Sequence, residues 1–423
     1  MLLPLLVIAS MVAADPPPPM LSADPPPPLP VVATNAMGGR VFRIPLGLAF
    51  DSIAPALRPG DEVVLERGVH VPFTLTDLRG EPGKPIVIRG ESGEEPARFP
   101  YVKATDRGIT LVRPRNVVLR DLMVGNGTGS LVRIVGERTE GGEPWDANVQ
   151  VRSLRVMQTN PEPDQVSLEL RDVARVDVSD MQFLGWNRAA VRVVASSRCS
   201  LNLCVLDPVK ALPQRTGVQV LQGCSQVAMS LLTFGPGVGT AFELGACEGA
   251  AADAAAATNL LVSRCSVPEA GAFVQLGSVE HALLQWNTAT DLRRAVWGVP
   301  ADCGFPNGVT LSDNLFTWTP GMIERVSEVP EGLPAESVRL QANLWWSPEI
   351  PAAFEAIGRP FGVELAPQVF NVDPKVEGRF GSPLEPKAAA FGWRAEPPKP
   401  AAVPPVPTGA TGPPPASQPP KPG

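Results

Sequence analysis

The sequence has little histidine and tyrosine. Its 423 residues include two His and one Tyr, and 6% of them are aromatic. His70 and His281 have no Ser or Cys partner at a recognisable spacing, which argues against a nucleophilic Ser–His or Cys–His site. The six cysteines form neither a CxxC motif nor a Cys/His cluster with the spacing of a zinc site. These absences remove several common classes of hydrolase and metalloprotein.

Basic clusters and long apolar runs are also missing. The formal charge is -7, and no cluster of Lys and Arg stands against it, so nucleic acid is not expected as a partner. The first apolar run, Leu2 to Ala14, is shorter than the roughly 20 residues that cross a bilayer. With small residues before a Pro tract, it resembles a secretory signal cut near Ala14, although no Lys or Arg precedes it.

We therefore expect a secreted, periplasmic or cell-surface protein with no transmembrane span after signal cleavage; an uncleaved membrane anchor is the alternative. Two Pro-rich segments, 15–30 and 396–423, cannot bury enough apolar surface to fold. These segments are simple spacers, or else a cell-envelope tether or a recognition tail. We interpret the chain as a signal peptide (1–14), a Pro-rich linker and lead-in (15–44), one folded domain (45–392) and a disordered tail (393–423).

The central part of the chain repeats a nine-residue pattern with apolar residues at positions 2, 4, 7 and 9. About nine copies occur, spaced about 22 to 33 residues apart. The copies are NVVLRDLMV (116), NVQVRSLRV (148), RVDVSDMQF (175), RCSLNLCVL (198), QVAMSLLTF (226), NLLVSRCSV (259), HALLQWNTA (281), GVTLSDNLF (308) and SVRLQANLW (337).

A second short alternating segment precedes most copies. These segments are LVRIV (131), VSLEL (166), AVRVV (190), GVQVL (217), AFELG (241), FVQLG (273) and MIERV (322). Alternation of period two predicts strands with one buried face. No segment keeps a helical apolar stripe, and a propeller blade would need about 40 residues and four strands. The pattern predicts an all-β, single-stranded right-handed parallel β-helix of about nine or more coils.

The segments of variable length are expected between position 9 and the next first strand, and these loops are where function would be placed. We assign NGTGS, QTNPEPD, GPGVG, NTATDLRR and VPADCGFP to such loops.

Position 7 of the pattern predicts one internal column of stacked side chains. Like residues stack at about 4.8 Å, so Asn287, Asn314 and Asn343 should form an amide ladder. Cys204 and Cys265 lie two coils apart in that column, roughly 9.6 Å, too far to pair, and we expect buried free thiols. The pairing of Cys199, Cys224, Cys247 and Cys303 stays open.

Residues 48–91 carry a resemblance to a known family. A short amphipathic helix with Phe50 and Ile53 on its apolar face is followed by PGD, an apolar strand and PIVIRG. Together with the coils and residues 369–392, this resembles pectin-lyase-like right-handed β-helix proteins, which include polysaccharide lyases. The resemblance implies that the helix covers the open end of the coil stack. It implies little about activity, because this fold carries many activities.

Some activities of this family are not supported by the sequence. The polygalacturonase signatures NTD, DD, GHG and RIK are absent. The family's carbohydrate lyases are implied to use a calcium-binding carboxylate cluster with Arg or Lys. No compact run of Asp and Glu is evident in the strands.

In this superfamily the substrate groove runs along the outward face of the strand before the nonapeptide. A uronate-cleaving lyase must neutralise a carboxylate and remove the neighbouring proton, which calls for cations beside a carboxylate. Arg133 and Arg192 are therefore candidates for the base or the carboxylate clamp, and Glu169 for a calcium ligand or an orienting group. Gln219, Glu243 and Gln275 are candidates for substrate binding, with Glu324 continuing the series after a gap.

The same charges fit a second hypothesis. Opposite charges on neighbouring strands stabilise a sheet by a few tenths of a kcal/mol each without any substrate. The sequence thus predicts a monomeric exported protein that binds or acts on extracellular polysaccharide, with lyase-like activity on uronic-acid polymers as one possibility. The alternative is a noncatalytic glycan-binding or cell-surface scaffold of the same fold.

Overall fold

The computed structural model describes residues 31–91, 100–158, 164–208, 215–247, 255–319, 321, 323, 325–348, 354, 357–370, 372–377, 382–383 and 388–392. The signal-like segment, the Pro-rich residues 15–30 and the tail 393–423 lie outside these residues. Within the described part, no helix combines the length and apolar character that a bilayer crossing demands.

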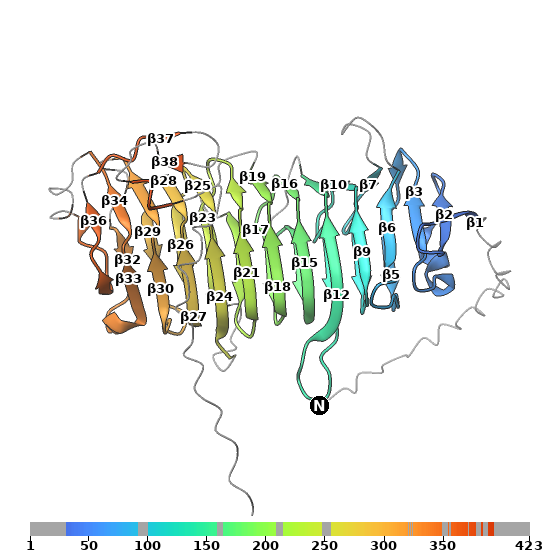
Figure 1. Ribbon diagram of the computed structural model, residues 1–423, viewed down its shortest axis with the longest axis horizontal. Coiled ribbons are helices and arrows are strands. Elements are labelled where there is room, and N and C mark those ends of the chain that lie inside the picture. Colours follow the sequence, from blue (N-terminus) through green and yellow to red (C-terminus); the bar gives the residue numbers. More distant parts are fainter. Residues whose placement is uncertain are drawn as a thin grey trace, which may run out of the picture.

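Three long sheets run side by side along the molecule, and the chain visits them in turn, once per coil (Figure 1). The fourteen-strand sheet contains β1 (Val31–Thr34), β2 (Arg40–Ile44), β3 (Glu62–Leu65), β6 (Ile86–Gly90), β9 (Val117–Arg120), β12 (Trp145–Arg152), β15 (Val173–Ser179), β18 (Ser197–Asn202), β21 (Ser225–Ser230), β24 (Ala257–Ser263), β27 (Val279–Gln285), β30 (Val309–Ser312), β33 (Val338–Gln341) and β35 (Val363–Ala366).

The other two sheets are built from shorter strands. The twelve-strand sheet contains β4 (Val69–His70), β7 (Tyr101–Lys103), β10 (Met123–Gly125), β13 (Arg155–Met157), β16 (Gln182–Leu184), β19 (Val205–Asp207), β22 (Thr233–Phe234), β25 (Ser266–Pro268), β28 (Thr288–Leu292), β31 (Leu315–Trp318), β34 (Leu344–Trp346) and β36 (Val369–Phe370). The ten-strand sheet contains β5 (Phe73–Thr76), β8 (Ile109–Val112), β11 (Val132–Val135), β14 (Val166–Arg171), β17 (Ala189–Val194), β20 (Thr216–Leu221), β23 (Thr240–Ala246), β26 (Ala272–Leu276), β29 (Ala295–Gly298) and β32 (Ser327–Glu328).

The sequence prediction of a right-handed parallel β-helix is confirmed. Each strand pairs in parallel with the strands one coil before and after it, for example β14 with β11 and β17. The exceptions among the described strands are β1, antiparallel to β2, and the small pair β37 (Val376–Glu377) and β38 (Ser382–Pro383). Figure 1 shows the coils stacked along the long axis, from the blue end to the orange end.

Each nonapeptide supplies two strands joined by a sharp bend. In the copy at 148, β12 ends at Arg152 and β13 begins at Arg155. Position 6 makes this bend in the left-handed helical region, with φ between 48° and 57° in all nine copies. The residue at that position is never glycine, so the stacking of neighbouring coils must hold a backbone conformation that L-residues rarely adopt.

The column at position 7 is buried along its whole length, from Leu122 to Asn343. The predicted amide ladder is confirmed: Asn287 Nδ2 donates to Asn314 Oδ1 at 2.9 Å, and Asn314 Nδ2 donates to Asn343 Oδ1 at 2.9 Å. The ladder continues to Gln368, whose Oε1 accepts from Asn343 Nδ2 at 3.2 Å. Sequence reasoning missed Gln368 because it lies outside any nonapeptide.

The cysteines divide into two kinds. Cys204 and Cys265 are buried free thiols, as predicted, and so are Cys199 and Cys224. Burial raises the pKa of the Cys199, Cys204 and Cys265 thiols to about 12 and that of Cys224 to about 11, so all four act as small apolar residues. The remaining pair, Cys247 and Cys303, forms a disulfide across 56 residues of sequence.

The N-terminal end differs from the expected arrangement. The short helix is present as a 3-10 helix, η1 (Phe50–Ala56), and Phe50 packs on Phe73 of β5 with ring centroids 4.8 Å apart. Pro55 lies inside it, which disfavours a longer α-helix. Strand pairing already begins at Val31, in the segment interpreted as lead-in, and β1 and β2 extend the fourteen-strand sheet. A second 3-10 turn, η3 (Ala335–Ser337), precedes β33.

Candidate functional site

One column of outward-facing side chains runs along the ten-strand sheet. The strand register aligns each residue of this column with the next, coil by coil. The column consists of Thr74, Thr110, Arg133, Glu169, Arg192, Gln219, Glu243, Gln275, Gly298 and Glu328. The structure therefore brings the six candidate site residues, Arg133 to Gln275, onto consecutive coils.

The last part of this column corrects the sequence interpretation. Glu324 was expected to follow after a gap, but it lies outside the described residues, and the register gives the position to Glu328. The segment MIERV was expected to be a strand, whereas the strand here is β32, Ser327–Glu328. Gly298 of β29 occupies the position of the column between Gln275 and Glu328. Sequence reasoning missed β29 because its residues, AVWG, are buried throughout and show no alternation.

Glu169 lies in the N-terminal half of the column and is only 5% exposed. Its carboxylate accepts hydrogen bonds from Ser130 Oγ at 2.8 Å and from Arg171 Nε at 2.7 Å, and Arg133 Nη2 lies 3.5 Å away. Burial raises the pKa of Glu169, but the hydrogen bonds from Arg171 and Ser130 and the charge of Arg133 outweigh it, so the pKa lies below its ordinary value. The negative charge of Glu169 is balanced by the neighbouring arginine side chains, and both of its carboxylate oxygens accept hydrogen bonds.

Arg192 follows Glu169 on the next coil. Burial, with a further contribution from the positive charge of Arg188, lowers the pKa of Arg192 to about 10; the charge of Glu169 acts in the opposite direction. The N-terminal half of the groove thus gathers guanidinium groups around one carboxylate. We use the name basic half for Arg133, Glu169, Arg171, Arg188 and Arg192.

The geometry around Glu169 does not fit a calcium ligand. Both of its oxygens already accept from protein donors, Ser130 on one and Arg171 on the other. Ca²⁺ takes six to eight oxygen ligands, several of them carboxylates. Across the described ranges, no group of three or more His, Cys, Asp or Glu side chains is arranged to hold a metal ion. No step of a mechanism is therefore derived through calcium here.

The C-terminal half of the column opens into a cavity of about 380 Å³. Its floor is formed by the outward column itself, with Gln219, Glu243, Gln275 and Glu328. We use the name acidic cavity for the full lining, which consists of Gln219, Thr240, Glu243, Leu244, Ala246, Cys247, Gln275, Gly277, Arg294, Val299, Pro300, Asp302, Cys303 and Glu328. All three residues predicted to bind substrate belong to it.

Gly298 of the outward column is covered by the side chain of Gln275. A Cβ atom on Gly298 would lie 2.8 Å from the Gln275 amide nitrogen, so a side chain here would collide with Gln275.

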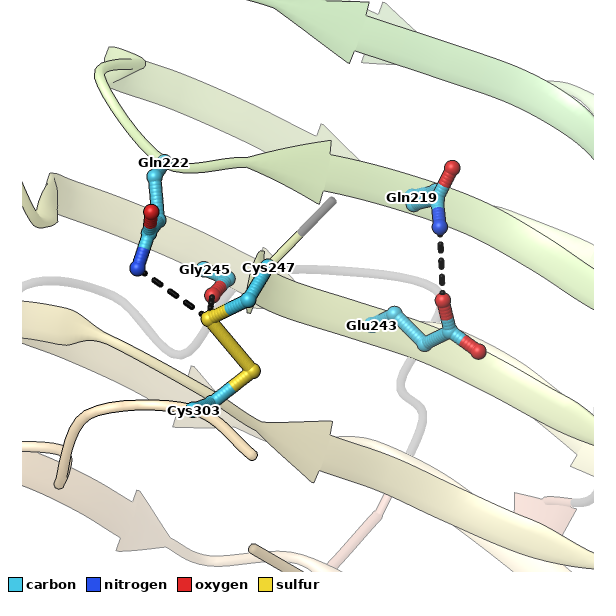
Figure 2. The surroundings of a disulfide bond; sticks show 6 residues. All are labelled: Gln219, Gln222, Glu243, Gly245, Cys247 and Cys303. Atoms are coloured by element: carbon cyan, nitrogen blue, oxygen red, sulfur yellow. Dashed lines mark hydrogen bonds between the residues drawn. A yellow bond between two sulfur atoms is a disulfide. The ribbon is translucent and has the colours of Figure 1, made fainter. Parts of the chain in front are cut away.

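One wall of the acidic cavity is a loop held by the disulfide. Cys303 lies in the segment between β29 and β30, and it is bonded to Cys247 at the end of β23, with Cα atoms 5.7 Å apart. Figure 2 shows this bond beside Glu243 and Gln219, which lie on neighbouring strands. Gln222 Nε2 lies 3.1 Å from the Cys247 sulfur. The bond ties the loop to the sheet two coils earlier.

This loop, VPADCGFP, was expected between position 9 and the next first strand. It lies instead after the first strand, between β29 and β30. NTATDLRR, also expected to be a loop, contains β28 (Thr288–Leu292). The loop VPADCGFP was misplaced because β29 was not recognised as a strand, whereas NTATDLRR contains the second strand of the nonapeptide at 281, extended to Leu292. The sequence analysis consequently missed Arg294, Asp302 and Glu328 as members of a site.

Glu243 contrasts with Glu169 although both occupy the same column. Glu243 Oε1 accepts from Thr216 Oγ1 at 2.5 Å, and Oε2 accepts from Gln219 Nε2 at 2.9 Å (Figure 2). Both donors are neutral. No ion pair joins Glu243 to any cation in the part of the chain that the structure describes. Its negative charge is therefore held by neutral dipoles alone.

The pairing of Glu169 predicts an acid-dependent loss of stability. Glu169→Gln should lower the free energy of unfolding by about 2 to 3 kcal/mol at pH 7, because hydrogen bonds to a charged group are lost. The pKa of Glu169 in the folded protein lies below its ordinary value, so the stabilisation by this carboxylate is complete above the ordinary pKa and is lost as the pH falls through the folded-state pKa. Urea unfolding of both proteins between pH 7 and pH 3 should show the difference shrinking.

Asp146→Asn provides the matched control for Glu169→Gln. Asp146 forms an exposed ion pair with Arg175 on the fourteen-strand sheet, and its loss should cost about 1 kcal/mol or less. A Glu169→Gln protein as stable as the Asp146→Asn protein at pH 7 would contradict a structural role for the buried carboxylate.

Comparisons with known proteins were made by sequence and by structure. No family model matches the chain, and no curated protein matches its sequence. Among solved structures, similar ones include a PL6 family alginate lyase, AlyGC, with 11% identity and a TM-score of 0.48; the match covers 84% of this chain and 57% of that one. This chain therefore spans little more than half the length of that protein.

Two further structures are similar to a lesser degree. A mannuronic-acid-specific family 6 polysaccharide lyase from human gut microbiota has 14% identity and a TM-score of 0.43, covering 79% of this chain and 91% of that one. The A-module of the Azotobacter vinelandii mannuronan C-5 epimerase AlgE6 has 11% identity and a TM-score of 0.42, covering 76% and 93%. At such identities no residue role is carried over, and function has to be argued from the site itself.

Proposed function

We propose that this protein is exported and binds a polysaccharide along the outward face of the ten-strand sheet. The observation that carries this proposal is the acidic cavity, which lies directly on the outward column and is floored by Gln219, Glu243 and Gln275. Amides both donate and accept hydrogen bonds, and carboxylates accept them, which suits sugar hydroxyls that do both.

A polymeric ligand suits this face better than a small molecule. Neighbouring coils present equivalent outward positions about 4.8 Å apart, so the column is a periodic array of polar groups. The cavity is continuous with that column, since Gln219 belongs to both and Arg192 precedes it on the adjacent coil. A chain of sugars laid along the coil axis could contact the basic half and the acidic cavity together.

A uronate lyase is the second candidate, and it is favoured by the environment of Arg192. Burial and Arg188 lower the pKa of Arg192, which makes its neutral form more accessible as a base. The other guanidinium groups of the basic half would neutralise the uronate carboxylate. In this hypothesis Arg192 takes the proton next to the carboxylate, the electron pair forms a carbon–carbon double bond, and the glycosidic oxygen leaves with a proton from water.

In this hypothesis Glu169 would orient other groups and would not itself react. Glu169 holds Arg171 at 2.7 Å and Arg133 at 3.5 Å, so its proposed role is to position guanidinium groups toward the groove. Calcium at Glu169 would displace these contacts. It therefore enters the proposal as a variable to be tested and not as a resident ion.

The test is to incubate the protein with pectate, alginate and chondroitin, each with calcium or with a chelator, while following the absorbance of unsaturated uronides. Binding is measured in parallel by calorimetry. Arg192→Ala should weaken binding about 10-fold or more and abolish any absorbance change. Glu280→Gln, an exposed position on β27, is the control. Binding without product formation would leave recognition as the function, and absence of binding to any polysaccharide would overturn the proposal.

A further inference from the structure

We propose that the ligand is a polysaccharide that carries both carboxylate groups and unacetylated amino groups, with the ammonium of an amino sugar bound in the acidic cavity. This inference rests on the proposed function and names its substrate class. The observation behind it is that the outward column has two neighbouring parts of opposite charge, and that two carboxylates of the acidic cavity, on Glu243 and Asp302, have no ion pair within the described residues.

The charged groups are unevenly divided along the groove. The basic half holds four guanidinium groups and Glu169, and Asp164 lies 3.6 Å from Arg188. The lining of the acidic cavity holds three carboxylates, on Glu243, Asp302 and Glu328, and one guanidinium, on Arg294. A ligand with carboxylates alone would be attracted at one end and repelled at the other.

The carboxylates of the acidic cavity differ in how their charge is balanced. Arg294 Nε lies 3.4 Å from Glu328 Oε2, so this pair is neutral as a unit. Asp302 is exposed on the wall loop, and Glu243 accepts only from Thr216 and Gln219. For neither does the described structure contain an ion pair. A cation that enters the cavity would therefore meet two carboxylates whose charge the protein does not neutralise.

Glu243 and Glu169 differ in the charge of the side chains that bind them. Both side chains point outward from the same column, so stacking of the strands alone would predict similar partners for the two carboxylates. Glu169 is neutralised by Arg133 and Arg171, whereas Glu243 has neutral donors. A half-buried carboxylate without a cation carries a desolvation cost, and a ligand ammonium would offset that cost with charge-assisted hydrogen bonds.

Gln219 lies between the two parts and supplies an independent observation. Its side chain is 7% exposed, and its Nε2 donates to Glu243. Figure 2 shows its amide oxygen directed away from Glu243. That oxygen is buried and has no hydrogen-bond partner. An unpaired buried acceptor is costly, and a donor of a ligand in the cavity would satisfy it only if the amide turned toward the cavity.

The distance between the two parts suits one polymer. Arg192 and Glu243 are separated by two coil steps, through Gln219, which corresponds to about 10 Å along the axis. Nearby sugars of a single chain can span this separation. The groove would thus bind a uronate at the basic half and an amino sugar at the acidic cavity at the same time.

The inference is tested with one polymer in two chemical forms. A chain of alternating glucuronic acid and glucosamine is prepared N-acetylated and N-deacetylated, so that only the ammonium differs. Alginate supplies carboxylates without amines, and chitosan supplies amines without carboxylates. By calorimetry, the N-deacetylated chain should bind at least 10-fold more tightly than its N-acetylated form and more tightly than either single-charge polymer.

Two variants locate the effect. Glu243→Gln keeps the size of the side chain and should remove most of the gain that deacetylation gives, which is measured as the ratio of the affinities for the two polymer forms in the same variant. Glu280→Gln makes the same chemical change at an exposed position on the fourteen-strand sheet and should preserve the gain. Circular dichroism of both variants establishes that they are folded before binding is compared.

The outcomes separate this inference from the proposed function. Equal binding of both polymer forms, or an undiminished gain in Glu243→Gln, would overturn the inference while polysaccharide binding stands. Absence of binding to every polymer would overturn both. Ca²⁺ is added at equal ionic strength as a further test. If it removed the gain in affinity that deacetylation gives, the cavity would hold a divalent cation, and this result would also count against the amino sugar.

Discussion

Replacing Asn314 with leucine is expected to lower the free energy of unfolding by about 3 to 5 kcal/mol, because it interrupts the amide ladder at its centre. Asn314 Oδ1 accepts from both the backbone nitrogen and Nδ2 of Asn287, each at 2.9 Å. Its Nδ2 donates to Leu284 O at 2.9 Å and to Asn343 Oδ1 at 2.9 Å. Leucine has a similar size but leaves these buried partners without a hydrogen bond.

The effect of Asn314→Leu should be concentrated near its own coil, since coils of a solenoid contact only their neighbours. Urea unfolding gives the total loss, and amide hydrogen exchange should rise most at the neighbouring residues Asn287 and Asn343. Asn148→Gly is the control, because Asn148 is exposed and has a φ of 46° that glycine adopts readily. A loss as small as that of the control would show that the ladder adds no stability.

Replacing Phe273 with alanine is expected to cost a similar amount, about 3 to 5 kcal/mol, through loss of packing. Phe273 is completely buried and lies between two other rings, with centroid distances of 5.6 Å to Phe242 and 5.4 Å to Phe316. These rings belong to a stack that runs through the core from Phe234 to Trp345. The edge-to-face and tilted ring contacts stabilise the fold beyond the burial of apolar area. Alanine would lose these contacts and leave a cavity that the neighbouring coils cannot fill.

Phe305→Ala is the matched control for this substitution. Phe305 is 46% exposed, and its truncation should change the free energy of unfolding by about 0.5 kcal/mol or less. The unfolding temperatures of the unsubstituted protein, Phe273→Ala and Phe305→Ala are compared by thermal unfolding. If Phe273→Ala unfolded at the same temperature as Phe305→Ala, the aromatic stack would not be a source of stability.

The sequence predicted most of the coil architecture because that information is local and repeated. The alternation of apolar residues fixes which face of each strand is buried, and a slip of one residue would expose the whole set. The same repetition placed the three Asn residues in one column. It also aligned Arg133 through Gln275 correctly, since residues at equivalent positions of consecutive coils must stack.

The limits of this prediction lie where the repeat is broken. Strand β29 is buried at all four positions and carries no alternation, so the loop after it was misplaced. Gln368 ends the amide ladder from a segment with no recognisable repeat. The 3-10 helix η1 packs on β5 as expected of an apolar face, but nothing local predicted that β1 and β2 would extend the sheet beyond it.

By itself, then, the sequence determined the stacking of the coils and the identity of the outward column. Only the tertiary structure decided which part of that column becomes a cavity. The disulfide joins Cys247 to Cys303 across two coils, and the wall residue Asp302 lies next to Cys303 on the later coil. A periodic pattern sets the position of each residue within its own coil, whereas a cavity depends on how irregular loops return to the sheet, and loop closure leaves no periodic trace in the sequence.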